Sequence, residues 1–173
     1  RIALARWTDF GLQDLRDIGG WWDSADLAHF VGDESRFQLE IEGRKDSAFQ
    51  SGGETIFPEQ LEERFIQLVN KTKLSVKSIM FLPLADKKWG NRVCALINLH
   101  SAEALAFLAK EPNFFVNLVK DWHPAERPIE WLICKQLSSN LFGILDRKKW
   151  TIWVEQIKEE GKLDQFRVSA LSI

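Results

Sequence analysis

Apolar residues between positions 58 and 69 recur at the spacing of one helical face. They stand at i, i+4, i+7 and i+8, which puts one buried stripe on the helix: Leu61, Phe65, Leu68 and Val69. Pro58 suits the first helical position, and the acidic residues after it are favoured by the helix dipole. The pattern therefore predicts a helix that begins at Pro58, with Lys71 and Lys73 at its C-terminal end.

Strand-like and helix-like stretches follow this helix. The sequences SVKSIMFLPL and RVCALINL predict two strands joined by a turn at Gly90, and RPIEWLIC predicts a third strand. SAEALAFLAK and PNFFVNLVKDW predict helices, and Asp146 can cap a last helix that stops at Gly161. This order predicts a small α+β unit of about 110 residues, with a three-stranded sheet, from position 55 onward.

The N-terminal part of the chain has a weaker pattern. Residues 1–39 mix short apolar pieces with Gly19, Gly20 and many aspartates, and they predict irregular structure. Residues 37–41 alternate as an edge strand does, and residues 43–55 form a polar corner directly ahead of the predicted helix.

Composition narrows the class of protein. The 173 residues are 45% hydrophobic and 28% charged, as in a globular domain, and the net charge of −2 gives no general attraction to nucleic acid or anionic membrane. No apolar run approaches the roughly 20 residues that cross a bilayer. Cys94 and Cys134 lie in apolar strand-like runs, where two buried thiols are favoured over a disulfide, and no Cys/His spacing matches a zinc site.

Five short sequences, in order, carry a resemblance to a known family. They are WWDSADLA from Trp21, GRKD from Gly43, SGGETIFPEQLE from Ser51, DKKWGNRVCA from Asp86 and GILDR from Gly143. The set resembles the C-terminal part of the adenylate-forming acyl-CoA synthetases, over about Trp21 to Trp150. The form AFQSGGETIFPEQLE is most similar to the o-succinylbenzoate–CoA ligases of menaquinone and phylloquinone synthesis.

This resemblance implies a fold and a domain organisation. Residues 1–45 are expected to form the end of a large adenylate-binding domain, residues 46–160 a small mobile α+β lid, and residues 161–173 a tail. No Ser/Thr/Gly-rich phosphate loop ending in lysine precedes Trp21. The chain is therefore expected to be a fragment that is inactive alone, with its own N-terminal domain as a partner.

The resemblance also assigns the polar corner and the residues before it. It makes Asp26 a ligand of the ribose hydroxyls, Arg44 a contact to the ribose and adenylate, and Asp46 the hinge of the lid. A carboxylate and a planar guanidinium suit these tasks because each makes strong, directed hydrogen bonds. From the residues alone, a capping aspartate, a solvated charge and a plain turn residue are equally open readings.

Two further groups are implied to meet CoA. The loop Ser51, Gly52, Gly53 and Glu54 is expected to line the pantetheine tunnel, although a bare Gly-Gly is also an ordinary turn. Arg147, Lys148 and Lys149 stand in the first turn of the last helix, where the dipole disfavours cations. They are either CoA phosphate contacts or a solvated face near Asp146.

Ile144 departs from the family pattern. Gly143, Arg147 and Trp150 keep their places, but isoleucine stands where the family has the lysine that contacts the acyl carboxylate and α-phosphate. Loss of one such donor costs roughly 10²–10³ in rate. The resemblance therefore implies impaired adenylation, while thioester formation is expected to survive.

The expected function is that of an ATP-dependent acid–CoA ligase of the cytoplasm. Its expected substrates and cofactors are a small-molecule acid, ATP, CoA and Mg²⁺, with the Mg²⁺ site in the N-terminal domain. No nucleic acid, membrane span or metal site is expected in this chain. One alternative is a non-catalytic relic or interaction module that keeps the lid fold, and another is an unrelated small α+β binding domain.

Overall fold

The chain divides into two compact units, Arg1–Asp46 and Ser47–Ile173. The computed structural model describes residues 5–9, 11–32, 36, 38–135, 137 and 146–170. Within these ranges, no helix combines the length and the apolar character needed to cross a bilayer.

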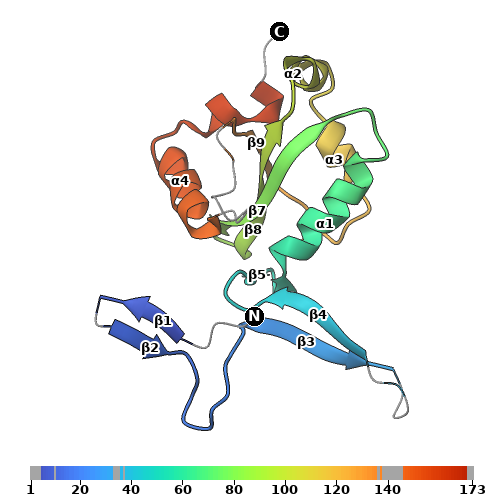
Figure 1. Ribbon diagram of the computed structural model, residues 1–173. Coiled ribbons are helices and arrows are strands. Elements are labelled where there is room, and N and C mark those ends of the chain that lie inside the picture. Colours follow the sequence, from blue (N-terminus) through green and yellow to red (C-terminus); the bar gives the residue numbers. More distant parts are fainter. Residues whose placement is uncertain are drawn as a thin grey trace. The chain divides into compact units, whose positions relative to one another are not determined.

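The first unit consists of two antiparallel hairpins (Figure 1). Strands β1 (Ala5–Thr8) and β2 (Gly11–Asp14) form one, and β3 (Asp26–Val31) and β4 (Gln38–Arg44) form the other. The edge strand predicted at residues 37–41 corresponds to β4, but the irregular structure predicted over residues 1–39 is wrong. Every residue of β3 is exposed, so neither face carries the alternation by which a strand is recognised.

The second unit follows the predicted order of elements. Pro58 begins α1, and Asp146 caps α4 by accepting a hydrogen bond from the Lys149 N–H. Gly161 lies two positions after the last residue of α4 and has a φ of 67°. The helix predicted over residues 112–122 is shorter than expected. The elements are β5 (Phe49–Ser51), β6 (Glu54–Ile56), α1 (Pro58–Val69), β7 (Val76–Asp86), β8 (Gly90–Leu99), α2 (Ala102–Lys110), α3 (Phe114–Leu118), β9 (Glu130–Ile133), α4 (Arg147–Glu159), η1 (Leu163–Phe166) and η2 (Val168–Ala170).

A three-stranded sheet in the order β7-β8-β9 forms the centre of this unit. Strand β8 pairs antiparallel with β7 and parallel with β9. Its successive residues enter two different hydrophobic clusters: Val93, Ala95 and Ile97 join one, and Cys94 and Leu96 join the other. Because both faces are buried, β8 is a continuous apolar run rather than an alternating one.

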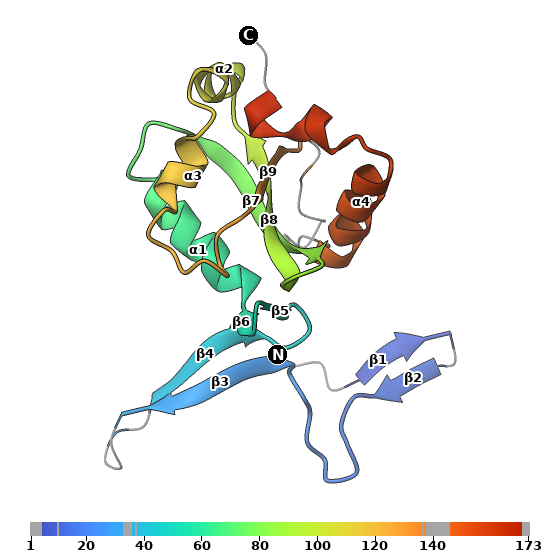
Figure 2. The same ribbon diagram turned by 180° about the vertical axis from the view of Figure 1, so that it is seen from behind.

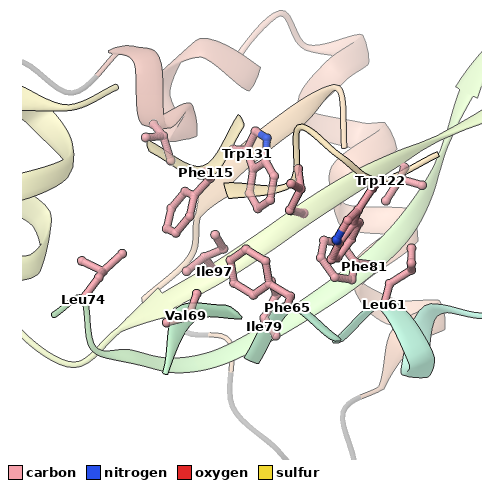
Figure 3. Packing of buried hydrophobic residues seen from close by; sticks show 14 of the residues in the cluster. Leu61, Phe65, Val69, Leu74, Ile79, Phe81, Ile97, Phe115, Trp122 and Trp131 are labelled. Carbon is pink, nitrogen blue, oxygen red and sulfur yellow. The ribbon is translucent and has the colours of Figure 1, made fainter. Parts of the chain in front are cut away.

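Helices cover both faces of the sheet (Figures 1 and 2). Residues of α1, α2 and α3 belong to the first cluster, and residues of α4 belong to the second. Figure 3 shows the first cluster, in which the Phe65 ring of α1 lies 5.9 Å from Phe81, 5.6 Å from Phe115 and 5.5 Å from Trp131, centroid to centroid.

The two cysteines are buried thiols, which confirms the favoured prediction over a disulfide. Burial raises the pKa of the Cys94 thiol, and the negative charge of Glu130 raises it further. Cys94 is therefore a neutral packing residue of the second cluster.

The tail after α4 packs back onto the second unit. Leu163 joins the second cluster and Val168 joins the first, so the tail passes from one face of the sheet to the other. It crosses the open edge of β9, where Arg167 forms an antiparallel bridge with Leu132 and a two-point ion pair with Glu130 at 2.6 and 2.7 Å. The weakly patterned tail is therefore part of this core.

The packing of Phe65 makes a prediction about stability. Phe65→Ala removes a ring with 0% exposure, and we expect a loss of about 3–5 kcal/mol in unfolding free energy. The matched control is Ile152→Ala on α4, whose side chain is 58% exposed and whose loss is expected within about 0.5 kcal/mol. Urea denaturation of both variants measures the difference, and equal losses would contradict this description of the core.

Candidate functional site

Arg44 lies between the two carboxylates predicted around it. The register of β3 and β4 pairs Asp26 with Arg44 directly. The Nε and Nη2 atoms of Arg44 donate to the two carboxylate oxygens of Asp46, each at 2.8 Å. Its Nη1 lies 3.8 Å from Asp26 Oδ1. The predicted ribose ligand, adenylate contact and hinge residue therefore form one ionic cluster at the end of the first unit.

The turn before Asp26 holds an unusual backbone conformation. Ala25 has a φ of 61°, a left-handed value that costs a non-glycine residue about 1–2 kcal/mol. Hydrogen bonds hold this turn, since the Ala25 N–H donates to Asp23 Oδ1 and the Lys45 N–H donates to the Ala25 carbonyl at 2.6 Å. The family has glycine at this position by resemblance. Here the glycine-like conformation is kept with alanine.

The electrostatics of the cluster favour ionised carboxylates. The side chains of Arg44, Asp26 and Asp46 are 49%, 40% and 60% exposed, so water screens the ion pairs. The hydrogen bonds from Arg44 hold the pKa of Asp46 below its ordinary value of 3.8. Exposed carboxylate oxygens of Asp26 can accept hydrogen bonds from hydroxyl groups, and the Arg44 guanidinium lies beside them.

The predicted CoA loop is the tight turn of the β5–β6 hairpin. Ser51 pairs with Glu54, leaving Gly52 and Gly53 as the two turn residues, with φ of 59° and 93°. Ser51 is fully buried, and its hydroxyl donates to the Ala125 carbonyl at 3.1 Å. In this loop, Gly52, Gly53 and Glu54 are exposed, whereas Ser51 anchors the hairpin to the rest of the second unit.

Trp89 explains why the first turn residue is glycine. A Cβ atom on Gly52 would lie 2.2 Å from Trp89 Cε3, whereas a Cβ on Gly53 would meet nothing within 4 Å. The Gly52 N–H also donates to the Trp89 carbonyl at 3.0 Å, and the Arg92 guanidinium stacks 4.5 Å from the indole ring. The contact of the Trp89 ring with Gly52 is therefore a packing contact.

Arg147 has protein partners rather than an open position. Its Nη1 donates to Glu62 Oε1 at 2.6 Å and to the Phe81 carbonyl at 2.9 Å, and its Nη2 donates to Glu59 Oε1 at 3.0 Å. Only 18% of the Arg147 side chain is exposed. In this structure the anionic neighbours of Arg147 are Glu59 and Glu62, and its prediction as a CoA phosphate contact stays a prediction.

The remaining predicted residues are exposed or lie outside the described residues. Lys148 and Lys149 are exposed on the first turn of α4, and their prediction as phosphate contacts stays a prediction. Gly143 and Ile144 fall outside the residues that the structure describes, so the departure from the family lysine is a fact of the sequence alone.

Cavities and metal clusters add no second site. Two shallow cavities of about 320 and 240 Å³ are lined by residues such as Glu130 and Arg167, and none of the predicted site residues lines either. In the described part of the chain, no group of three or more His, Cys, Asp or Glu residues could hold a metal ion.

Sequence reasoning missed three contacts of the site. The first is the hydrogen bond from the Ser51 hydroxyl to Ala125, 74 positions away, and the second is the stacking of Arg92 on Trp89, 3 positions away. The third is the ion pair of Arg147 with Glu62, 85 positions away. The position of Arg147 in the first turn of α4, where the helix dipole disfavours a cation, was a usable signal for the third contact. The spacing of the residues along the chain gave no signal for the other two contacts.

The arrangement of the second unit matches the C-terminal domain of adenylate-forming acyl-CoA synthetases. An Escherichia coli MenE variant solved with bound OSB-AMS aligns with 86% of this chain and 29% of its own, at 26% identity and a TM-score of 0.57. The resemblance predicted from the five short sequences is thereby confirmed, and so is the α+β fold class. No protein-family model matches the chain.

The curated relatives point to one kind of ligase. The 2-succinylbenzoate–CoA ligase of Haemophilus influenzae is 33% identical over 99 residues, which is 57% of this chain and 20% of that protein. The Escherichia coli enzyme of the same name is 27% identical over 156 residues, 90% of this chain and 31% of that protein. The chain thus spans between a fifth and a third of the length of these relatives.

The hairpin geometry makes a paired prediction. Gly53→Ala carries the cost of a left-handed backbone, about 1–2 kcal/mol. Gly52→Ala carries the same cost and a clash with the Trp89 ring, so we expect it to lose about 1 kcal/mol more than Gly53→Ala. Thermal unfolding of the two variants decides this, and a larger loss in Gly53→Ala would contradict the described contact.

The Arg44 pair makes a prediction about titration. Because the folded-state pKa of Asp46 lies below the unfolded value of 3.8, the pair contributes stability above that value and loses it as the pH falls through the folded pKa. In a carboxyl ¹³C titration, we expect Asp46 to titrate below pH 3.8 and to move toward it in Arg44→Met. Lys45→Met removes a neighbouring charge without this hydrogen bond and is expected to leave the midpoint in place.

Proposed function

We propose that this chain forms the ribose-contacting segment and the lid of an ATP-dependent acid–CoA ligase, with o-succinylbenzoate as the acid. The lid covers the acyl-adenylate in the first half-reaction and then turns about Asp46 to admit CoA in the second. The observation that carries the proposal is the alignment of 88–90% of this chain with two relatives named 2-succinylbenzoate–CoA ligase. A ligase of this kind serves menaquinone or phylloquinone synthesis.

The division of the chain supports a pivot at Asp46. The two compact units meet between Asp46 and Ser47. A pivot needs few packed side chains, and the Asp46 side chain is 60% exposed. Its carboxylate bonds to Arg44 of the first unit, so this ion pair holds one side of the proposed pivot.

Asp26 and Arg44 supply the nucleotide contacts in this proposal. Asp26 accepts hydrogen bonds from the ribose hydroxyls, and the Arg44 guanidinium donates to the ribose and adenylate region. Arg44 is held by Asp46 in the structure, so the proposal requires the guanidinium to shift or to share its five donors between Asp46 and the ligand. The pair thus connects the nucleotide to the pivot.

The Gly52–Gly53 turn supplies the path for CoA. Nothing lies within 4 Å of a Cβ built at Gly53, so the backbone there is open to close approach, whereas Trp89 fills the corresponding space at Gly52. Lys148 and Lys149 are exposed ammonium groups that suit the phosphates of CoA. The described residues offer no place for Mg²⁺, and no step of this proposal passes through it.

A second candidate rests on Ile144. Isoleucine cannot donate a hydrogen bond or a charge to the developing adenylate, so a relic or interaction module with the lid fold is the alternative. The two functions differ in whether the complete protein catalyses either half-reaction.

The experiment separates the half-reactions in the complete protein that contains this chain. Adenylation is followed by acid-dependent exchange of pyrophosphate into ATP, and thioester formation is followed from supplied o-succinylbenzoyl-adenylate and CoA. We expect thioester formation in the natural sequence, and we expect Ile144→Lys to raise the adenylation rate by roughly 10²–10³.

Ile152→Lys is the control for the added lysine. Ile152 is 58% exposed on α4, so this variant adds the same charge away from the family position, and adenylation is expected to stay unchanged. If neither half-reaction occurs in the natural sequence and Ile144→Lys restores neither, the ligase proposal is wrong and the relic is supported.

A further inference from the structure

Side chains close the outer edge of β7 at Phe81. Among the described residues, the sheet order β7-β8-β9 leaves β7 at an edge, so its peptide groups that face away from β8 have no strand partner there. At Phe81 two ionised side chains take that place. The Phe81 N–H donates to Glu62 Oε1 at 2.8 Å, and the Phe81 carbonyl accepts from Arg147 Nη1 at 2.9 Å.

Glu62 and Arg147 also bond to each other. Arg147 Nη1 lies 2.6 Å from Glu62 Oε1, and Nη2 lies 3.1 Å from Glu62 Oε2, which is a two-point contact. Nη2 donates to Glu59 as well. We call Arg147, Glu59, Glu62 and Phe81 the edge clasp. The side chains of Arg147 and Glu62 are each 18% exposed, so water competes weakly for these bonds.

The edge clasp connects the two layers of helices. Glu59 and Glu62 belong to α1, which packs on the first cluster, and Arg147 is the first residue of α4, which packs on the second. Figures 1 and 2 show α1 and α4 on opposite sides of the sheet, with β7 between them at the edge. The Arg147 side chain therefore reaches round the strand edge from one layer to the other.

Both helices that the edge clasp connects lie next in sequence to residues used in the proposed function. Helix α1 begins two positions after β6, the second strand of the Gly52–Gly53 hairpin. The first turn of α4 carries Lys148 and Lys149 directly after Arg147. A shift of either helix along the sheet edge would change the distance between the hairpin and these lysines.

We propose that Arg147 is a positioning residue of the lid, resting on the proposed function for its effect on catalysis. Through Glu62 and Phe81 it holds the first turn of α4 in register with α1, so that the hairpin and the α4 N-terminus move as one rigid body.

Arg64 is the matched control. It lies on α1 and also has an ion pair, to Glu126 at 2.9 Å, and a stacking contact 4.6 Å from the Trp122 ring. These contacts do not reach α4. Arg64→Met therefore removes an arginine with an ion pair and a ring contact without releasing the edge clasp, although the Arg64 side chain is more exposed than that of Arg147, 43% against 18%.

Two readouts test the inference in Arg147→Met and Arg64→Met, compared at temperatures equally far below each melting temperature. The first is hydrogen exchange at the amides of Phe81 and Trp150, which we expect to accelerate about tenfold or more in Arg147→Met alone, because local opening frees both groups. The second is the thioester half-reaction of the complete protein, whose kcat at saturating CoA we expect to fall about tenfold from misplacement of the reacting groups.

Glu62→Gln keeps the experiment decisive if Arg147→Met does not fold. It retains an acceptor for the Phe81 N–H and loses the charge that binds Arg147, so Trp150 exchange is expected to rise while Phe81 exchange changes less. Equal effects of Arg147→Met and Arg64→Met on both readouts would overturn the positioning role. Absence of thioester formation in the natural sequence would count against the proposed function, and the exchange comparison would then decide the inference alone.

Discussion

Burial of both faces of the β7-β8-β9 sheet is the constraint on which the second unit depends. A sheet with two apolar faces must be covered twice, and the chain does this with α1, α2 and α3 on one face and α4 on the other. The tail then crosses the β9 edge, and the Arg147 side chain crosses the β7 edge. At each open edge of the sheet, a chain segment or a side chain therefore connects the helix layer on one face with the layer on the other face.

The first unit has a different physical character. Its hairpins expose apolar side chains, with Phe30 74% and Leu39 62% exposed, and one of its ionic clusters lies around Arg44. The strained turn at Ala25, the β3–β4 register and the Asp46 pair all converge on that guanidinium. Along the chain, the first unit with its ionic cluster ends at Asp46, and the unit with the doubly covered sheet begins at Ser47; the proposed rotation of the lid takes place at this boundary.

The helices and strands that bury one face, or both faces, in the core could be predicted from the sequence. The α1 stripe and the apolar runs of β7 and β8 reflect burial directly, and the Pro58 and Asp146 signals reflect the unpaired ends of a helix. Strands β2 and β3 could not, because side chains that are nearly all exposed leave no alternation of buried and exposed positions to detect. Individual partners also escaped prediction: Arg147 was assigned to a ligand because the sequence shows its cost at a helix start but not the two glutamates of α1 that offset it.

In the proposed function, the second unit turns as one body about Asp46 between the two half-reactions. Spin labels on Gln13→Cys and Glu111→Cys, which are exposed positions in different units, allow the inter-unit distance to be measured in the complete protein. We expect one distance distribution with o-succinylbenzoyl-adenylate alone and a clearly displaced one when CoA is added with a non-reactive adenylate analogue. A single distribution that is the same in both conditions would contradict this rotation.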